Sequence, residues 1–380
     1  MAYESIDRLQ KLLAEEVFHY TADAKKAAGR ALGTLVEIIT FYLLKSWNFQ
    51  DSIAIEKSLP EYGNHEITHN VEFSLHPILN ELTIVLPYSN LPFTATRITA
   101  QLPEKLYPAK FRRQGTTLLT RDEILRNACT VAVGSTSHLV ATLISQNKNE
   151  AGIGIIEQYL KPYAIFECKR VGVEEGMKKG PQTIEKAKQG AYVARTVSSL
   201  QKIRTASGEL HGLIYKADQS LYSKRYSDLL TEIIASNDPS LLKDFILTVG
   251  VVSNHGNWFT SDNHNKELKV LAQSYDWLLF LTDVGLAEFI TELLLKPVRL
   301  LKPARTAFLA SYSAQKTKNC FTKVQMDLQA DTVLQSYFVT NAARIKNWFN
   351  IIAPARGTIN SLKSQLSELR KKNWAEIHST

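Results

Sequence analysis

The order of apolar and polar residues predicts a chain that mixes helices with strands. Apolar side chains recur at helical spacing in residues 6–17 and again in residues 21–47. Between residues 65 and 75 they alternate with polar ones, which is typical of a strand with one buried face. Further strands are expected at 81–88, 151–160, 163–170, 210–217, 245–253 and 277–282, and further helices at 120–129, 135–145, 181–204, 286–295 and from 359 onward. These elements predict an α/β fold.

Two pairs of these strands are expected to form hairpins. The strands at 151–160 and 163–170 are separated only by a short turn containing Pro162, and 81–88 is the expected partner of 65–75. The strand at 163–170 contains Glu167, Cys168 and Lys169 near its end. Because side chains two apart in a strand project to one face, Glu167 and Lys169 would stand side by side there. A carboxylate beside an ammonium suits a site where a hard divalent cation polarises a water molecule or a phosphate.

Glu37 is a further charged residue with an unusual position. It lies in the second helix, in a half that is apolar nearly all round. Thr21 is expected to cap this helix, and Gly29 and Gly33 are expected to let it approach the sheet closely. A buried carboxylate is costly unless it is paired or binds a metal. Glu37 is therefore expected either to pair with a lysine or to join a metal site.

The charge and the cysteine content narrow the class of protein. The 380 residues include 45 Lys and Arg against 37 Asp and Glu, a net charge of +8, which suits a polyanionic partner without requiring one. The 3 cysteines are far apart and odd in number, so reduced thiols are expected. The first residues lack the features of a signal peptide, and no apolar run approaches the roughly 20 residues that span a bilayer. The sequence predicts a soluble, cytoplasmic protein.

Residues 65–69 match HExxH, the motif of zinc peptidases. That chemistry requires a helix, which brings both histidines to one face. The alternation of apolar residues through Ile67, Val71 and Phe73 predicts a strand instead. In a strand, His65 and His69 would be about 13 Å apart, too far to share one zinc ion. A zinc peptidase is therefore the less favoured alternative.

The end of the strand at 163–170 resembles a known signature. Glu167-Cys168-Lys169 after an apolar run is similar to the second half of the signature of the PD-(D/E)xK nucleases, found in many type II restriction endonucleases. The helix around Glu37 resembles the helix before the sheet that often carries a further metal-binding glutamate in these enzymes. The resemblance implies a restriction-endonuclease-like fold, with a mixed central sheet flanked by helices. It also implies sequence-specific, Mg²⁺-dependent hydrolysis of double-stranded DNA by a homodimer, alongside a cognate DNA methyltransferase that is not bound.

The resemblance assigns roles to individual residues. Glu167 would hold the metal, and Glu37 would support a second ion or its water. Lys169 would orient the attacking water and stabilise charge on the phosphate. Gln189, in the helix expected at 181–204, would help to place the water or the lysine.

One part of the signature is missing from its expected place. The family needs an acid on the first strand of the hairpin, but no aspartate lies between Asp122 and Glu167. Glu157 would replace it after a three-residue turn, and Glu150 after a two-residue turn, because a slip of one residue moves every side chain to the other face.

The resemblance also implies a DNA-binding surface and a division of the chain. A nuclease domain is expected at 1–340 and a helical extension at 341–380. The main alternative is a non-catalytic DNA-binding protein with a degenerate nuclease core. The side chains expected to contact DNA are Lys178, Lys179, Lys186, Lys188, Arg195, Arg112 and Arg113.

Overall fold

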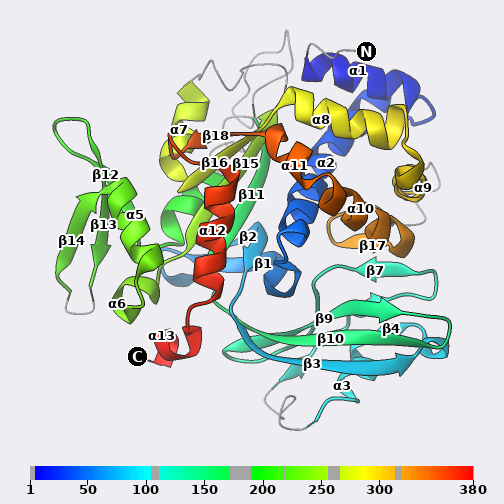
Figure 1. Ribbon diagram of the computed structural model, residues 1–380, viewed down its shortest axis with the longest axis horizontal. Coiled ribbons are helices and arrows are strands. Elements are labelled where there is room, and N and C mark those ends of the chain that lie inside the picture. The colour runs from blue at the N-terminus through cyan, green and yellow to red at the C-terminus, as the bar shows by residue number, and fades with distance from the viewer. Residues whose placement is uncertain are drawn as a thin grey trace.

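The centre of the molecule is a six-stranded mixed sheet in the order β1-β2-β11-β15-β16-β18 (Figure 1). The computed structural model describes residues 5–103, 111–171, 190–216, 219–255, 266–312 and 319–379. Neighbours among β1, β2 and β11 pair antiparallel, β11, β15 and β16 run parallel, and β18 returns antiparallel. The strands are β1 (Ile53–Glu61), β2 (Asn64–Leu75), β11 (Ala164–Val171), β15 (Leu247–Asn254), β16 (Trp277–Leu281) and β18 (Phe349–Ala353).

Helices cover both faces of this sheet, as the continuous apolar runs of β15 and β16 require. On one face lies α2 (Ala24–Ser46), whose Phe41 stacks on Phe73 of β2 with ring centroids 5.9 Å apart. On the other face lie residues 190–196, which are helical, and α7 (Lys266–Ser274). β11 therefore runs through the middle of the sheet, between helices.

The insertion between β2 and β11 forms a second sheet, in the order β3-β10-β9-β8-β5. Both expected hairpins are wrong. β10 pairs with β3 and β9 in the second sheet, whereas β11 and β2 pair with each other in the central one. The short connection after β10 thus carries the chain from one sheet to the other. The strands are β3 (Ile78–Pro87), β10 (Glu150–Tyr159), β9 (Ser137–Gln146), β8 (Cys129–Val133) and β5 (Arg112–Arg113).

Two expected helices in this insertion are strands. Residues 120–129 form a turn and β7 (Ile124–Arg126), and residues 135–145 lie largely in β9. β8 and β10 flank β9 and bury its first half, so tertiary packing overrides the local preference. β7 belongs to a small sheet in the order β17-β7-β6-β4. Its other members are β17 (Gln325–Asp327), β6 (Thr117–Leu119) and β4 (Phe93–Thr94), with η2 (Tyr88–Asn90) and α3 (Ala95–Thr99) nearby in sequence.

A third unit lies at the left of Figure 1, where β12, β13 and β14 form a three-stranded sheet beside α5. The strand expected at 210–217 is in this unit and does not extend the central sheet. The helix expected at 181–204 ends by residue 196, and its last residues form β12; residues 172–189 lie outside the described ranges. The elements are β12 (Gln201–Arg204), β13 (Leu210–Tyr215), β14 (Leu221–Arg225), α5 (Tyr226–Ala235) and α6 (Pro239–Leu242).

The C-terminal part completes the core. Residues 341–380, expected as a helical extension, contribute β18 to the central sheet. Leu362, Leu366 and Leu369 of α12 are buried, and Trp277 Nε1 donates to Gln365 Oε1 at 2.8 Å, so α12 packs on the domain. The remaining helices are α1 (Ile6–Glu16), η1 (Gln50–Ser52), α8 (Asp283–Ile290), η3 (Thr291–Leu295), η4 (Arg299–Leu301), α9 (Lys302–Ser311), α10 (Leu328–Thr340), α11 (Ala342–Ile345), η5 (Lys346–Trp348), α12 (Ile359–Arg370) and α13 (Trp374–Ser379).

α2 is the central helix, and it differs from the expectation in two details. Its N-cap is Asp23 and not Thr21, since the Asp23 carboxylate accepts from the Lys26 amide. A Cβ on Gly29 would meet Gln10 of α1 at 3.3 Å, and one on Gly33 would meet nothing within 4 Å, so neither serves an approach to the sheet. By length and hydropathy α2 could cross a membrane, but 67% of its most apolar window is buried, as in the core helix of a soluble protein.

Candidate active site at the end of strand β11

Glu167 and Lys169 occupy the position that the sequence predicts. Lys169 Nζ lies 3.3 Å from Glu167 Oε2, and His69 Nε2 of β2 lies 3.9 Å from Glu167 Oε1. The Glu167 side chain is only 1% exposed, whereas that of Lys169 is 32% exposed. The lysine therefore connects a buried carboxylate to the surface.

The burial of Glu167 has an electrostatic cost. Its carboxylate oxygens have only long contacts with Lys169, at 3.3 Å, and His69, at 3.9 Å, and neither oxygen makes a well-aligned hydrogen bond within the described part of the chain. Burial raises the pKa of Glu167, although the charges of Lys169 and His69 act in the opposite direction. A buried carboxylate with free lone pairs is the kind of group that a hard cation satisfies.

Glu72 is a second carboxylate at the same point, and sequence reasoning missed it. β2 and β11 are paired through Ala164–Phe166, and Phe73 is opposite Phe166 in the last pair. One residue further along this register, Glu72 follows on β2 and Glu167 on β11. The two acids therefore lie on adjacent strands just beyond the last pair, where Glu72 is directed to Lys323 on the α2 side and Glu167 to the helix at 190–196.

The β1–β2 ribbon is twisted where Glu72 lies. Phe73 packs on α2, but Val71, two residues earlier, packs on the opposite face of the sheet. Opposite this point on β1, Glu56 has a φ of 52°, in the left-handed region that non-glycine residues rarely adopt. This departure from a regular ladder re-aims Glu72 and Glu56, and backbone strain of this kind clusters at functional sites.

Lys323 lies among three carboxylates beside this point. Its Nζ is 3.3 Å from Glu37 Oε2, 3.1 Å from Glu56 Oε1, and in contact with Glu72 Oε1. The Lys323 side chain is 11% exposed, so the ammonium is nearly buried. One cation therefore neutralises acids from α2, β1 and β2 together. Of the two alternatives expected for Glu37, the structure shows the pairing with a lysine.

Glu37 is linked to both parts of the site. Burial raises its pKa, while the charges of Lys323 and Lys169 act to lower it. Cys168, between Glu167 and Lys169, faces α2 and its thiol donates to Thr40 Oγ1 at 3.4 Å. Glu37, Glu72, Glu167, Lys169 and Lys323 are called the carboxylate site below.

The donors of the carboxylate site suit a hard divalent cation in part. Carboxylate oxygens are the ligands that Mg²⁺ prefers, and both buried oxygens of Glu167 lack hydrogen-bond partners among the described residues. As the side chains stand, however, no three His, Cys, Asp or Glu residues in the described ranges are arranged to hold a metal ion. The carboxylates are therefore chemically suitable ligands for Mg²⁺. A bound Mg²⁺ would have to neutralise the acids that Lys323 now neutralises.

Glu157 and Glu150 do not belong to this site. Glu157 lies on β10 of the second sheet, where it accepts from Ser137 Oγ at 2.6 Å and from Asn80 Nδ2 at 2.7 Å. Glu150 is exposed at the start of the same strand, opposite Pro87. The prediction that one of them replaces the missing aspartate depended on the wrong hairpin.

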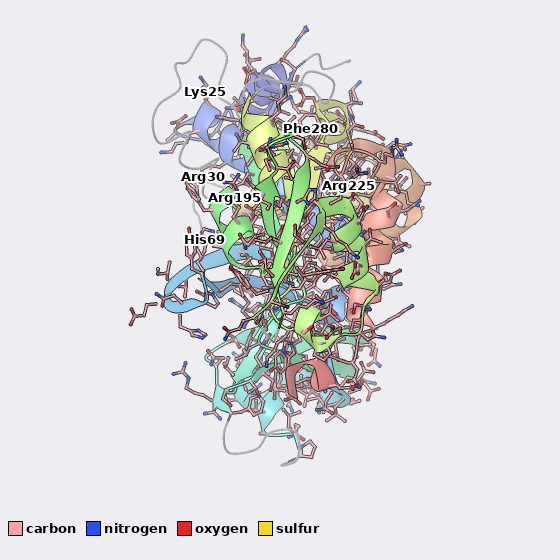
Figure 2. The ribbon with its side chains drawn as sticks, turned by 90° about the vertical axis from the view of Figure 1, so that its left-hand side faces the viewer. Lys25, Arg30, His69, Arg195, Arg225 and Phe280 are labelled. Atoms are coloured by element: carbon pink, nitrogen blue, oxygen red, sulfur yellow. The ribbon has the colours of Figure 1, made fainter. Side chains whose placement is uncertain are left out.

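The expected DNA-contacting residues are divided among several places. Arg195 is exposed beside the central sheet, while Arg112 and Arg113 are exposed on β5, an edge strand of the second sheet. Lys178, Lys179, Lys186 and Lys188 lie outside the described residues, and so does Gln189. Figure 2 shows Lys25 and Arg30 of α2, then Arg195 and His69, following one another down one side of the molecule.

The residue that follows Gln189 touches the site directly. A Cβ on Gly190 would collide with the hydroxyl of Tyr275, and it would lie 3.7 Å from Lys169 Cε and 3.8 Å from Glu167 Cβ. The helix at 190–196 therefore packs against the Glu167–Lys169 pair, as the resemblance implies for the helix after this strand.

In the sequence, His69 was singled out only as part of the HExxH match, whereas in the structure it lies beside Glu167. The structure confirms that residues 65–69 lie in a strand, β2, so a helical HExxH site is wrong.

The sequence did contain a signal for Glu72. It is an acid between the apolar residues Val71 and Phe73, in a strand that follows the Glu37 helix.

Comparisons of the chain with models of protein families, with curated proteins and with solved structures found no match.

Proposed function

We propose that the chain is a Mg²⁺-dependent nuclease that hydrolyses phosphodiester bonds of double-stranded DNA. The observation that carries the proposal is that Glu37 and Glu72 lie on the helix and strand that flank the Glu167–Lys169 pair. The PD-(D/E)xK signature calls for these parts: an acid helix, an acid on the neighbouring strand, and E-x-K at the end of a buried strand. We accordingly propose that the mixed sheet is restriction-endonuclease-like, with the second and third sheets as insertions.

The residues of the site have separate roles in this proposal. Glu167 and Glu72 would hold the metal, and Glu37 would support it from α2. When bound, the metal would supply a polarised water and neutralise charge on the scissile phosphate. Lys169, at the boundary between Glu167 and solvent, orients that water and stabilises the charge that develops on the phosphate. His69 supports the orientation of Glu167 from the other side.

Exposed positive charges support duplex DNA as the substrate. Exposed Lys25, Arg30 and Arg195 share one side of the molecule with His69 (Figure 2). A row of cations beside a metal site suits the phosphate backbone of a duplex, where each contact releases counterions. Recognition of a short palindrome by a homodimer, in the cytoplasm and alongside a cognate methyltransferase, remains part of the proposal.

One observation favours a second candidate function. Lys323 fills the space among Glu37, Glu56 and Glu72 in the way a structural cation does. If Lys323 holds this position permanently, the chain is a DNA-binding protein that has kept the fold without the metal. The two candidates differ in whether the protein binds Mg²⁺ and cleaves DNA.

A digest of long natural DNA, which contains every short palindrome many times, tests the proposal. We expect wild-type protein with Mg²⁺ to give discrete fragments, and no fragments with a chelator. Lys169→Ala should still retard DNA in a gel but should not cut it. DNA that is retarded and uncut by the wild type under every metal condition would establish the non-catalytic alternative.

A further inference from the structure

A cleft of about 800 Å³ lies at the opposite end of β11 from the carboxylate site. Its walls come from β1, from the turn after it, from residues 160–162 just before β11, and from residues 195–201. β9 of the second sheet contributes His138. The volume is typical of sites that enclose a small organic molecule, and no step of the proposed nuclease reaction uses this cleft.

His138 lines this cleft and has a buried hydrogen-bond acceptor without a partner in the described chain. The residue is fully buried, and its Nε2 lies 2.9 Å from Gln158 Oε1. The amide nitrogen of Gln158 donates to the carbonyls of Asp51 and Ile53, so the Gln158 oxygen must accept from His138. Nε2 therefore carries the proton, and Nδ1 is an acceptor that has no partner in the described chain.

The environment keeps the imidazole of His138 in this form. Burial lowers its pKa well below the usual range, and the charges of Lys57 and His76 act in the same direction. A buried acceptor without a donor is costly, and native proteins seldom leave one without a partner or a ligand. A ligand of the cleft would need to offer a hydroxyl or amine hydrogen to Nδ1.

Two further lining residues have polar groups without a partner in the described chain. Ser199 Oγ is buried and has no hydrogen-bond partner in the described chain. Lys57 of β1 is half-buried, makes no ion pair with a described residue, and has its pKa lowered by burial to about 8. An ammonium that is partly removed from water and left unpaired attracts an anion.

The charges around the cleft also favour an anionic ligand. The cations in its walls are Lys57, Lys161 and Arg195, and the one carboxylate among its described lining residues, Asp244, is already paired with Lys161. A ligand with about two negative charges would balance Lys57 and Arg195. Tyr62, whose side chain is exposed at the rim, offers a flat surface for a planar ring.

We propose that this cleft binds a nucleoside monophosphate. The phosphate lies against Lys57 and Arg195, a sugar hydroxyl donates to His138 Nδ1, and the base stacks on Tyr62. The site shares Arg195 with the proposed DNA-binding side but no residue with the carboxylate site, and its occupancy requires no divalent metal.

Isothermal titration with adenosine monophosphate in the presence of a chelator tests the proposal. We expect saturable binding at one site, with at least tenfold weaker affinity in Lys57→Met. Lys148→Met, which changes an exposed lysine on the β9–β10 turn, is the matched control and should bind as the wild type does. Lys169→Ala should also bind unchanged, which separates this site from the scissile-phosphate site.

The comparison ligands and one spectroscopic measurement complete the test. Equal affinity for adenosine would contradict the role of Lys57 and Arg195, and equal affinity for ribose 5-phosphate would contradict stacking on Tyr62. Nitrogen NMR of labelled histidine should show His138 as the neutral Nε2–H form, with its Nδ1 signal moving when the nucleotide is added. Absence of saturable binding, or binding that Lys57→Met leaves unchanged, would overturn the proposal.

Discussion

At the scale of single residues, the carboxylate site combines burial with charge at a cost in stability. Burial raises the pKa of Glu167, so the folded chain binds this proton more tightly than the unfolded chain does. The stabilisation linked to Glu167 is therefore complete below the ordinary carboxyl range, and it is lost as the pH rises through the raised pKa. Near neutral pH the ionised Glu167 destabilises the fold, but it is then a ligand ready for a cation.

Glu167→Gln should therefore increase stability near pH 7. We expect the free energy of unfolding to rise by roughly 1–3 kcal/mol, because the neutral amide avoids the cost of burying a charge, and that cost outweighs the attraction of Lys169 and His69. The difference should disappear near about pH 4, where the wild-type carboxyl is protonated. Denaturant titrations at the two pH values measure both effects. Glu157→Gln is the control, and it should be destabilising because Glu157 already has two hydrogen-bond donors. A destabilised Glu167→Gln at both pH values would contradict this view.

Lys323 gives a second prediction at this scale. Lys323→Met removes the cation shared by Glu37, Glu56 and Glu72, and leaves their charges facing one another. We expect a loss of about 3–5 kcal/mol, as for other broken buried ion pairs. Added Mg²⁺ should restore much of this loss by binding in place of the ammonium, which thermal unfolding with and without the ion will show.

The control for this variant is Lys302→Met, which changes an exposed lysine of α9 and should alter neither stability nor its response to Mg²⁺. If Mg²⁺ fails to stabilise Lys323→Met, the three carboxylates are a structural cluster and the non-catalytic alternative gains support.

Part of the site could be predicted from residues alone. Glu167 and Lys169 were predictable because a strand of known phase brings side chains two apart to the same face. Glu37 was predictable because a carboxylate in an apolar helix must find a partner. Glu72 could be noticed as an acid between two apolar residues, but its place next to β11 could not be predicted. That place depends on the pairing of β2 with β11, and the whole second sheet is inserted between these strands in the sequence. Local sequence contains no measure of such pairing.

At the scale of elements, the helix after β11 determines the shape of the site. It begins within the described chain at Gly190, whose missing side chain lets the backbone approach Tyr275, Glu167 and Lys169. Burial raises the pKa of Tyr275, as does the charge of Glu167, so its hydroxyl stays protonated beside the carboxylate.

Gly190→Ala should therefore move this helix away from the site. We expect a loss of stability of about 1–3 kcal/mol from overpacking, together with at least a tenfold loss in cleavage rate. The matched control is Gly33→Ala in α2, where a Cβ meets nothing within 4 Å. That change should raise stability by about 0.5–1 kcal/mol, because alanine favours a helix over glycine. Full cleavage activity in Gly190→Ala would show that the helix does not shape the site.

Errors in the predicted elements have one physical cause. The strands β11, β15 and β16 and the helix α2 were predictable because their apolar runs are long and unbroken. The stretch at 135–145 was expected to be helical, yet its hydrogen bonds go to β8 and β10. Which neighbour a short apolar stretch pairs with is decided by the whole insertion, and local propensity carries little of that information.

At the scale of the whole molecule, the proposed substrate must lie along the side that carries Lys25, Arg30 and Arg195 (Figure 2). Replacing all three by glutamine should weaken binding to DNA of any sequence. The slope of log affinity against log salt should become shallower by about 0.9 for each phosphate that the variant no longer neutralises. The control replaces Arg112 and Arg113 on β5, which belong to the other sheet, and should leave the slope unchanged. Equal effects of both sets would mean that the charge acts without a defined binding face.

The most direct test of the central claim compares the two candidate acids within one cleavage assay. Glu72→Gln and Glu157→Gln remove the same charge from two strands that lie in different sheets. With Mg²⁺ and long natural DNA, we predict that Glu157→Gln cuts at the wild-type rate and that Glu72→Gln retards the DNA but leaves it uncut. Wild-type cleavage by Glu72→Gln, with activity lost in Glu157→Gln, would contradict the assignment of the catalytic centre to the point where β2 and β11 separate.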